Sequence, residues 1–278
     1  MNYPHRRSDM LAPTPGAWRP TPLLWLSILL YPAAIAAILI EPSVWREAVA
    51  AVIANHLVLT AVGLWPRSRM LGPNWTRLPD AAAARNEIAI TIDDGPDPDV
   101  TPQVLDVLDR HRVRATFFCV GSKAQRHPEL CRDIIRRGHA VENHSANHCW
   151  HFSLLGLAGM RREVQAGQDM LIAATAQTPL FFRAPAGLRN PFLEAALCRL
   201  GLHLASWTRR GFDTRERDPE VVLTRLLRSL QGGDILLVHD GNSARTASGN
   251  PVILEVLPRL LDAVRRAGLR PVTLRSAL

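Results

Sequence analysis

The stretch EIAITIDDGPD, Glu87 to Asp97, decides the fold of this 278-residue chain. Its first seven residues, Glu87–Asp93, are rich in Ile and Thr and predict a buried β-strand. Gly95 and Pro96 then force a turn directly after the carboxylates Asp93 and Asp94. Two adjacent carboxylates are costly to bury unless positive charge compensates them. The stretch therefore predicts either a charged site at a strand end or an Asx-type turn that caps the next helix.

Downstream of this stretch the chain alternates strand-like and helix-like segments. Such alternation implies an α/β fold with parallel strands and crossover helices, and seven units within residues 86–278 favour a small barrel over an open sheet. Reactive side chains should then lie just after strands. The other expected strands are Arg114–Val120, His139–Asn143, Leu180–Ala184, Leu202–Thr208, Asp234–His239 and Arg270–Leu274. The expected helices are Thr101–His111, Lys123–Arg137, Leu154–Ala176, Pro191–Leu200, Pro219–Leu230 and Pro251–Ala267.

A metal site is indicated by NHSANH, which follows the third expected strand. In a helical turn, His144 and His148 would place both imidazoles on one face. With Asp94 they would form a two-histidine, one-carboxylate set, whose open positions are typical of a catalytic metal. The alternative is a surface histidine cluster, in which His139 and His151 compete as ligands.

Three further strand ends carry polar groups. Arg183 in RAPAG has a guanidinium that can hold a carboxylate, and the turn leaves the Ala186 N–H free to point into a site. His239 in LLVHD is the natural general acid, and Asp213 could orient it and raise its pKa. Each motif has a plainer interpretation, an ordinary turn or a structural hydrogen bond, but their common position after strands favours function.

Taken in order, TIDDGP, HSANH, RAPAG and LLVH resemble the polysaccharide deacetylase family, the NodB-homology domain of carbohydrate esterase family 4. The resemblance covers Glu87 to Leu274. It implies a distorted (β/α)7 barrel and hydrolysis of the N-acetyl group of an amino sugar. It also implies one divalent metal ion, with zinc expected ahead of cobalt, nickel or manganese.

The resemblance also implies a role for individual residues. Metal-activated water would attack the amide, with Asp93 as base, His239 as acid, and Asp94, His144 and His148 as metal ligands. Arg183 would tether Asp93, the Ala186 N–H would stabilise the oxyanion, Leu237 would line the acetyl pocket, and Asp213 would tune His239. The sequence departs from the family twice. Ala186 stands where a tyrosine is common, and WTRRGFD replaces the usual Asp-x-x-Asp-Trp motif before Asp213.

The N-terminal part of the chain has a different composition. Leu23–Ile40 is an apolar run without a charge, and Ala48–Leu64 is a second run interrupted only by Asn55 and His56. Their lengths predict one or two transmembrane helices rather than a cleaved signal peptide. The alternative is a buried core helix for the first run and an interfacial or core helix for the second. The expected organisation is a tail (1–22), a membrane anchor (23–64), a linker (65–85) and a deacetylase domain (86–278).

The arginines around the apolar runs predict the orientation. Arg6, Arg7 and Arg19 precede the first run, and only Arg46 lies between the runs. Four more follow the second run: Arg67, Arg69, Arg77 and Arg85. If both runs cross a bacterial inner membrane, both ends of the chain lie on its cytoplasmic side. If only one run crosses, the deacetylase domain lies outside the cytoplasm.

Charge and composition limit the classes of binding partner that we expect. The formal net charge is +8, but the chain shows no zinc-finger spacing or basic-aromatic pattern typical of nucleic-acid binding. We expect membrane lipids and an amino-sugar glycan as partners, lipid-linked if the domain is cytoplasmic and peptidoglycan or exopolysaccharide if it is not. Alternatives are a deformylase of a lipid-linked amino sugar and a catalytically silent glycan-binding protein. A glycosidase is disfavoured, because adjacent carboxylates rarely flank a sugar bond.

Overall fold

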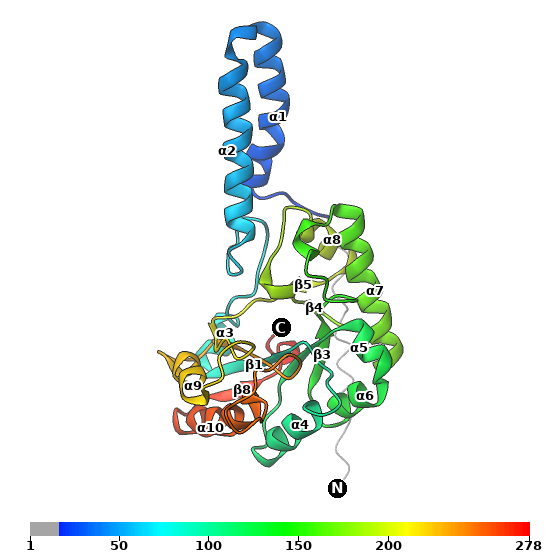
Figure 1. The fold of residues 1–278 in the computed structure, drawn as a ribbon, viewed down its shortest axis with the longest axis vertical. Coiled ribbons are helices and arrows are strands. Elements are labelled where there is room, and N and C mark those ends of the chain that lie inside the picture. Colours follow the sequence, from blue (N-terminus) through cyan, green and yellow to red (C-terminus); the bar gives the residue numbers. More distant parts are fainter. Residues whose placement is uncertain (1–16) are drawn as a thin grey trace.

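β1 (Glu87–Asp93) lies in the middle of a parallel sheet in the computed structural model, which describes residues 17–278 (Figure 1). The strands lie in the order β5-β4-β3-β2-β1-β7-β6, and β8 pairs with the first half of β1. Helices surround this curved sheet, so the expected distorted (β/α)7 barrel is confirmed. The other strands are β2 Thr116–Cys119, β3 Ala140–Asn143, β4 Phe181–Phe182, β5 His203–Leu204, β6 Arg209–Arg210, β7 Ile235–His239 and β8 Arg270–Val272.

The two faces of β1 divide the core. Ile88, Ile90 and Ile92 point outward and pack against the helices. Ala89 points inward and packs among the large side chains of Phe118 and Phe181. This period of two is what a strand buried on both faces requires. The same alternation places Asp93 on the inward side, at the C-terminal end of β1.

The helices cover the outside of the barrel. The single helix expected over Lys123–Arg137 is instead two, because Pro128 disfavours a helical conformation at His127, whose φ is −131°. The bounds are α3 Asp80–Ala84, α4 Thr101–Arg110, α5 Gly121–Arg126, α6 Pro128–Arg136, α7 Leu157–Thr175, α8 Leu193–Leu200, α9 Pro219–Leu227 and α10 Val252–Arg266.

The segment expected as a linker packs into the barrel. Within residues 17–278 no strand ladder joins β5 to β6, and residues 75–78 lie across this seam. The Trp75 N–H donates to Leu204 O at 2.9 Å, and the Leu78 N–H donates to Gly233 O at 2.8 Å. Leu78 is buried in the barrel core. Residues 65–85 therefore contribute hydrogen bonds and apolar packing to the barrel.

A helix hairpin projects from the barrel (Figure 1). It consists of α1 (Pro22–Ile40), a short turn and α2 (Trp45–Gly63), both long and apolar enough to cross a membrane. Apolar side chains such as Leu39, which is 79% exposed, cover its surface. Asn55 and His56 hold the two helices together: Ser27 donates to Asn55 Oδ1 at 2.8 Å, and Tyr31 contacts His56 at 3.3 Å.

Candidate metal and catalytic site

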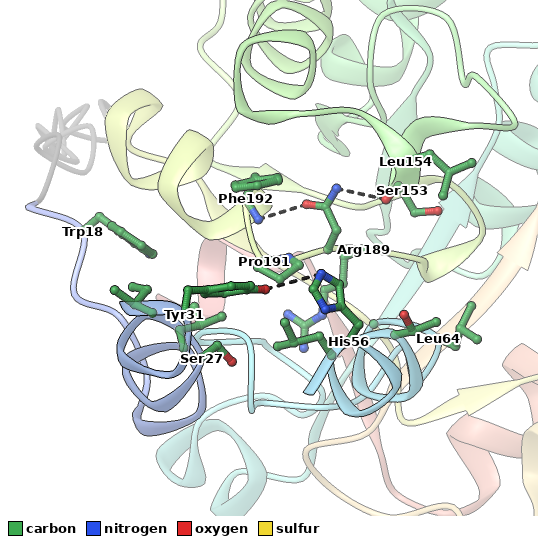
Figure 2. Close-up of a pocket in the computed structure, with 16 residues that line it drawn as sticks. Trp18, Ser27, Tyr31, His56, Leu64, Ser153, Leu154, Arg189, Pro191 and Phe192 are labelled. Atoms are coloured by element: carbon green, nitrogen blue, oxygen red, sulfur yellow. Dashed lines mark hydrogen bonds between the residues drawn. The ribbon is translucent and has the colours of Figure 1, made fainter. Parts of the chain in front are cut away.

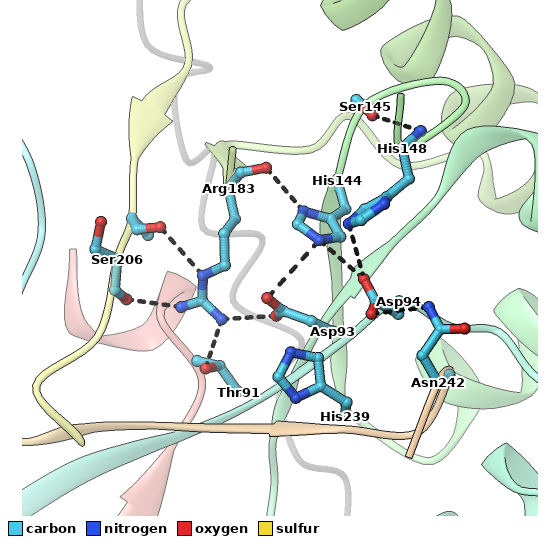
Figure 3. A network of polar contacts seen from close by, with 12 residues as sticks. Thr91, Asp93, Asp94, His144, Ser145, His148, Arg183, Ser206, His239 and Asn242 are labelled. Carbon is cyan, nitrogen blue, oxygen red and sulfur yellow. Dashed lines mark hydrogen bonds and ion pairs between the residues drawn. The ribbon is translucent and has the colours of Figure 1, made fainter. Parts of the chain in front are cut away.

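Four strand ends bring the sequence-predicted polar residues together (Figure 3). Asp93 ends β1, His144 follows β3, Arg183 follows β4 and His239 ends β7. These ends lie at one edge of the sheet because the ladders are parallel. Asp93, His144 and His239 line a cavity of about 220 Å³. The four polar residues therefore lie at or just after strand ends, where the sequence analysis expects reactive side chains.

Asp94, His144 and His148 form the candidate metal centre. Asp94 Oδ1 lies 3.2 Å from Nε2 of each histidine, and the three ligand atoms lie within 4.8 Å of one another. His144 Nδ1 lies 2.8 Å from Arg183 O, a contact that places a proton on Nδ1. A neutral imidazole in this tautomer offers Nε2 as a ligand, and the neighbouring Asp94 Oδ1 is buried without a hydrogen-bond partner within residues 17–278. The donor set therefore fits a divalent metal ion.

The local conformation around the two histidines differs from the expected helical turn. Residues 144–148 form a loop in which Ser145 and His148 have positive φ angles of 67° and 52°. The Ser145 hydroxyl accepts from the His148 N–H at 2.9 Å and fixes this loop. His139, a possible competitor, is buried elsewhere and accepts from the Ala115 N–H at 3.1 Å.

Asp94 is strongly biased toward its charged form. Burial opposes its ionisation, but the imidazoles of His144 and His148 outweigh burial and hold its pKa well below the usual value. Two residues that sequence reasoning missed support it. Asn242 donates to Asp94 Oδ2 at 3.1 Å, and Lys123 donates to the Asp94 carbonyl at 2.7 Å. Lys123 is the only lysine of the chain, which is the one signal that could have identified it.

Arg183 connects the Asp93 carboxylate to the barrel. Its Nη1 donates at 2.7 Å to Asp93 Oδ1 and also to Thr91 Oγ1. Its other nitrogens donate to the carbonyls of Ala205 and Ser206, which follow the neighbouring strand β5. The guanidinium is 1% exposed, and this charge compensates the burial of Asp93.

Asp213 holds His239 in place at the opposite side of the cavity. Asp213 Oδ1 lies 2.9 Å from His239 Nδ1, and Oδ2 accepts from the His239 N–H at 2.7 Å. Burial would lower the pKa of His239, but the charge and hydrogen bond of Asp213, with Asp93 and Asp94 nearby, raise it to about 9. The imidazole is therefore protonated at neutral pH.

The remaining predicted residues, Ala186 and Leu237, also line this cavity. Ala186 has a positive φ of 54° in the turn after β4, and Leu237 lies on β7 beside Thr91. Asp240, which sequence reasoning left without a role, is fully buried beneath the site and accepts from the Thr101 hydroxyl at 2.5 Å. A side chain on Gly95 would collide with this carboxylate, so the turn after β1 requires glycine there.

This barrel carries two histidines and a carboxylate at the C-terminal ends of its strands, and its sequence is similar to those of proteins with named activities. The family model "Polysaccharide deacetylase" matches residues 80–205. The chain is 32% identical over 193 residues to a peptidoglycan-N-acetylglucosamine deacetylase of Bacillus cereus, covering 69% of this chain and 87% of that protein. It is also 32% identical over 197 residues to a chitooligosaccharide deacetylase of Sinorhizobium fredii, covering 69% and 91%.

A solved structure agrees with these relatives. A family 4 carbohydrate esterase from Streptomyces lividans, in complex with acetate, superimposes with a TM-score of 0.60 at 30% identity, covering 66% of this chain and 91% of that one. The protein is thus a hydrolase that acts on the amide bonds of amino sugars. More particularly, the chain belongs to the polysaccharide deacetylase family.

Proposed function

We propose that this protein removes the N-acetyl group of an amino sugar with one divalent metal ion held by Asp94, His144 and His148. The observation that carries the proposal is Asp94 Oδ1, which is buried without a hydrogen-bond partner within residues 17–278 and lies 3.2 Å from His144 Nε2, at a cavity that Asp93 and His239 also line. Zinc suits two imidazoles and one carboxylate best, ahead of cobalt, nickel or manganese. A metal bound there would supply Lewis acidity to water and to the amide carbonyl.

Asp93 is the proposed general base. Its Oδ1 is held by Arg183, and its Oδ2 lies 3.8 Å from His144 Nε2, beside the metal ligands. The fixed carboxylate can therefore take a proton from an attacking water without first reorienting. Arg183 acts by positioning Asp93.

His239 is the proposed general acid. The same Asp213 contacts that raise its pKa to about 9 leave its Nε2 free to face the cavity. A protonated imidazole there can donate to the leaving amine, so that a free amino sugar and acetate are formed. The Ala186 N–H would stabilise the negatively charged oxygen, and Leu237 would contact the acetyl methyl group.

The location of the substrate depends on the helix hairpin. We propose that α1 and α2 both cross a bacterial inner membrane and that the barrel lies on the cytoplasmic side, which the flanking arginines support. A helix of 19 residues is about 28 Å long, close to the thickness of a bilayer core. An enzyme in this position would act on an amino sugar attached to a lipid rather than on finished cell wall.

The proposal is tested by measuring acetate release. The purified full-length protein, reconstituted with zinc, should release acetate from N-acetylated chito-oligosaccharide, and chelation should abolish the release. A matched formylated substrate, with formate as the product, separates a deacetylase from a deformylase. If neither the soluble nor a lipid-linked form of these substrates releases acid with any of the four metals, the protein is a silent glycan-binding member of the family and the proposal is wrong.

A further inference from the structure

A second cavity, of about 480 Å³, lies where the helix hairpin meets the barrel (Figure 2). This volume is within the range of roughly 300–1,000 Å³ that is typical of small-molecule sites. Its walls are mainly apolar and come from both parts of the molecule: Leu24, Ile28, Leu59 and Leu64 from the hairpin, and Leu154 and Phe192 from barrel loops. Leu154 is 77% exposed, so its side chain does not serve the barrel core.

The barrel side of this cavity is built from the same two loops that carry the catalytic residues. The loop after β3 contains His144 and His148 and continues to Leu154, and the loop after β4 runs from Arg183 through Ala186 to Phe192. Asn190 joins the two loops, because its amide donates to the carbonyls of Ser153 and Leu155 at 2.9 and 2.8 Å.

The two cavities are therefore close along the chain. Ala186 lines the catalytic cavity and Arg189 lines the apolar one, only three residues later. Three residues span at most about 11 Å, even when fully extended. A molecule with an apolar tail in one cavity could thus place its polar end in the other.

Arg189 introduces a buried positive charge into this apolar cavity. Its side chain is only 4% exposed, Nη2 donates to Ser68 O, and Nε has no hydrogen-bond partner within residues 17–278. Burial lowers the pKa of Arg189 to about 10, so the guanidinium stays charged at neutral pH. The facing carboxylate, Glu194, accepts from the Cys198 thiol instead. Arg189 lines the cavity and forms no ion pair within residues 17–278, and such a guanidinium favours an anionic partner, a class that phosphate fits.

The cavity also lies at the right depth for a lipid. Trp18 lines it, and Trp25 and Trp65 lie near the same ends of the helices, whereas Trp45 begins α2 at the far end of the hairpin. Tryptophan is enriched at both membrane interfaces. A hairpin that crosses the bilayer therefore places this cavity at the interface next to the barrel.

We propose that this cavity binds the hydrocarbon nearest the headgroup of an amino sugar linked to a lipid phosphate, for which polyprenyl phosphate serves as the probe. Arg189 would pair with the phosphate, and the sugar would extend along the loop after β4 to the metal site. This inference rests on the proposed deacetylation and on the membrane insertion of the hairpin. It names the lipid carrier as part of the substrate, which the relatives' activities do not require.

The test compares two substrates and two tryptophan variants of the full-length protein in lipid nanodiscs. The substrates are polyprenyl-phosphate-linked N-acetylglucosamine and soluble N-acetylated chito-oligosaccharide. Thr60→Trp fills the cavity, and Leu57→Trp is the matched control, because Leu57 lies on the same helix, is 66% exposed and does not line the cavity. We expect Thr60→Trp to raise KM for the lipid-linked substrate only, and Leu57→Trp to change neither KM.

Binding of polyprenyl phosphate alone, measured by native mass spectrometry, tests the cavity without catalysis. Loss of a charge-assisted hydrogen bond in Arg189→Met should weaken this binding about tenfold or more. Equal effects of the two tryptophan variants would overturn the inference, as would equal competition by phosphatidylglycerol, which would mean a general lipid site. If the wild-type protein binds polyprenyl phosphate but deacetylates neither substrate, the proposed function fails and the lipid site stands.

Discussion

In the proposed mechanism Asp213 would act through His239 rather than by contact with a substrate. One oxygen of its carboxylate contacts the imidazole of His239, and the other accepts directly from the backbone N–H of the same residue. Its charge is the largest influence that raises the pKa of His239 to about 9. The sequence motif before Asp213 departs from the family form, yet the carboxylate lies where an orienting group is needed.

The pH profile should report this pairing. His239 must be protonated to act as an acid, so activity should be lost as the pH rises through about 9. In Asp213→Asn the charge that raises this pKa is removed, and the alkaline limb of kcat/KM should move toward lower pH. Rates measured between pH 6 and 10 check this. An unchanged alkaline limb would assign it to a group other than His239.

Asp93 and Asp94 are adjacent, but replacing each with asparagine should change a different property of the enzyme. Asp93→Asn removes the proposed base and should reduce kcat by about 10²–10⁴-fold while metal content is retained. Asp94→Asn removes a ligand and should reduce metal content itself. Acetate release and metal analysis of both variants distinguish the two roles. Near-normal turnover by Asp93→Asn would show that another group takes the proton.

At the scale of elements, the site depends on contacts between strands. Arg183 follows a strand of only two residues, β4, but its guanidinium reaches β1 and the segment after β5. A short strand supplies few ladder hydrogen bonds, so these side-chain bonds help to fix its end. The same residue therefore supports both the fold and the position of Asp93.

Replacement of this arginine should destabilise the protein. Arg183→Met leaves Asp93 as a buried and unpaired charge, which should lower the free energy of unfolding by about 3–5 kcal/mol. Urea denaturation, followed by the fluorescence of the barrel, measures the loss, with the exposed Arg161→Met on α7 as the control. A loss no larger than that of the control would contradict this interpretation.

The segment from Trp75 to Ala82 should be needed for the full stability of the barrel. A fragment of residues 86–278 lacks Leu78 and also the ion pair of Arg77 with Asp234 at 2.6 Å, both present in 65–278. Loss of such packing should lower Tm by about 10 °C or more relative to 65–278. Thermal melting of the two fragments makes the comparison, and equal Tm values would place the boundary at residue 86.

At the scale of the whole molecule, the proposed orientation in a membrane would decide which substrates are accessible. Both helices of the hairpin have similar length, and their polar groups pair with each other: Ser27 with Asn55, and Tyr31 with His56. Mutual pairing of this kind is what two helices in a bilayer require. These contacts are compatible with the proposal that both helices cross a membrane.

A reporter fused after Leu278 should therefore be active only in the cytoplasm. We expect fluorescence from a cytoplasm-active reporter and no signal from a periplasm-active phosphatase at the same position. The opposite result would mean that α2 does not cross, and peptidoglycan or exported polysaccharide would become the substrate to test.

Local patterns in the sequence were sufficient for much of the fold. The uncharged run from Ile88 to Ile92 indicates a strand buried on both faces, because the side chains of a strand point alternately to its two sides and neither side carries a charge there. Strand ends then indicate where Asp93, His144, Arg183 and His239 lie, because parallel strands align their ends. The family resemblance follows from motifs at these same ends.

The tertiary structure alone decided contacts between distant parts of the chain. Asn242 supports Asp94 from 148 positions away, and Thr101 reaches Asp240 across 139 positions. Residues 75–78 lie across the seam between β5 and β6, and the apolar cavity forms only where the hairpin meets two loops. No periodicity records such contacts, because they depend on how completed elements pack rather than on the preference of any one segment.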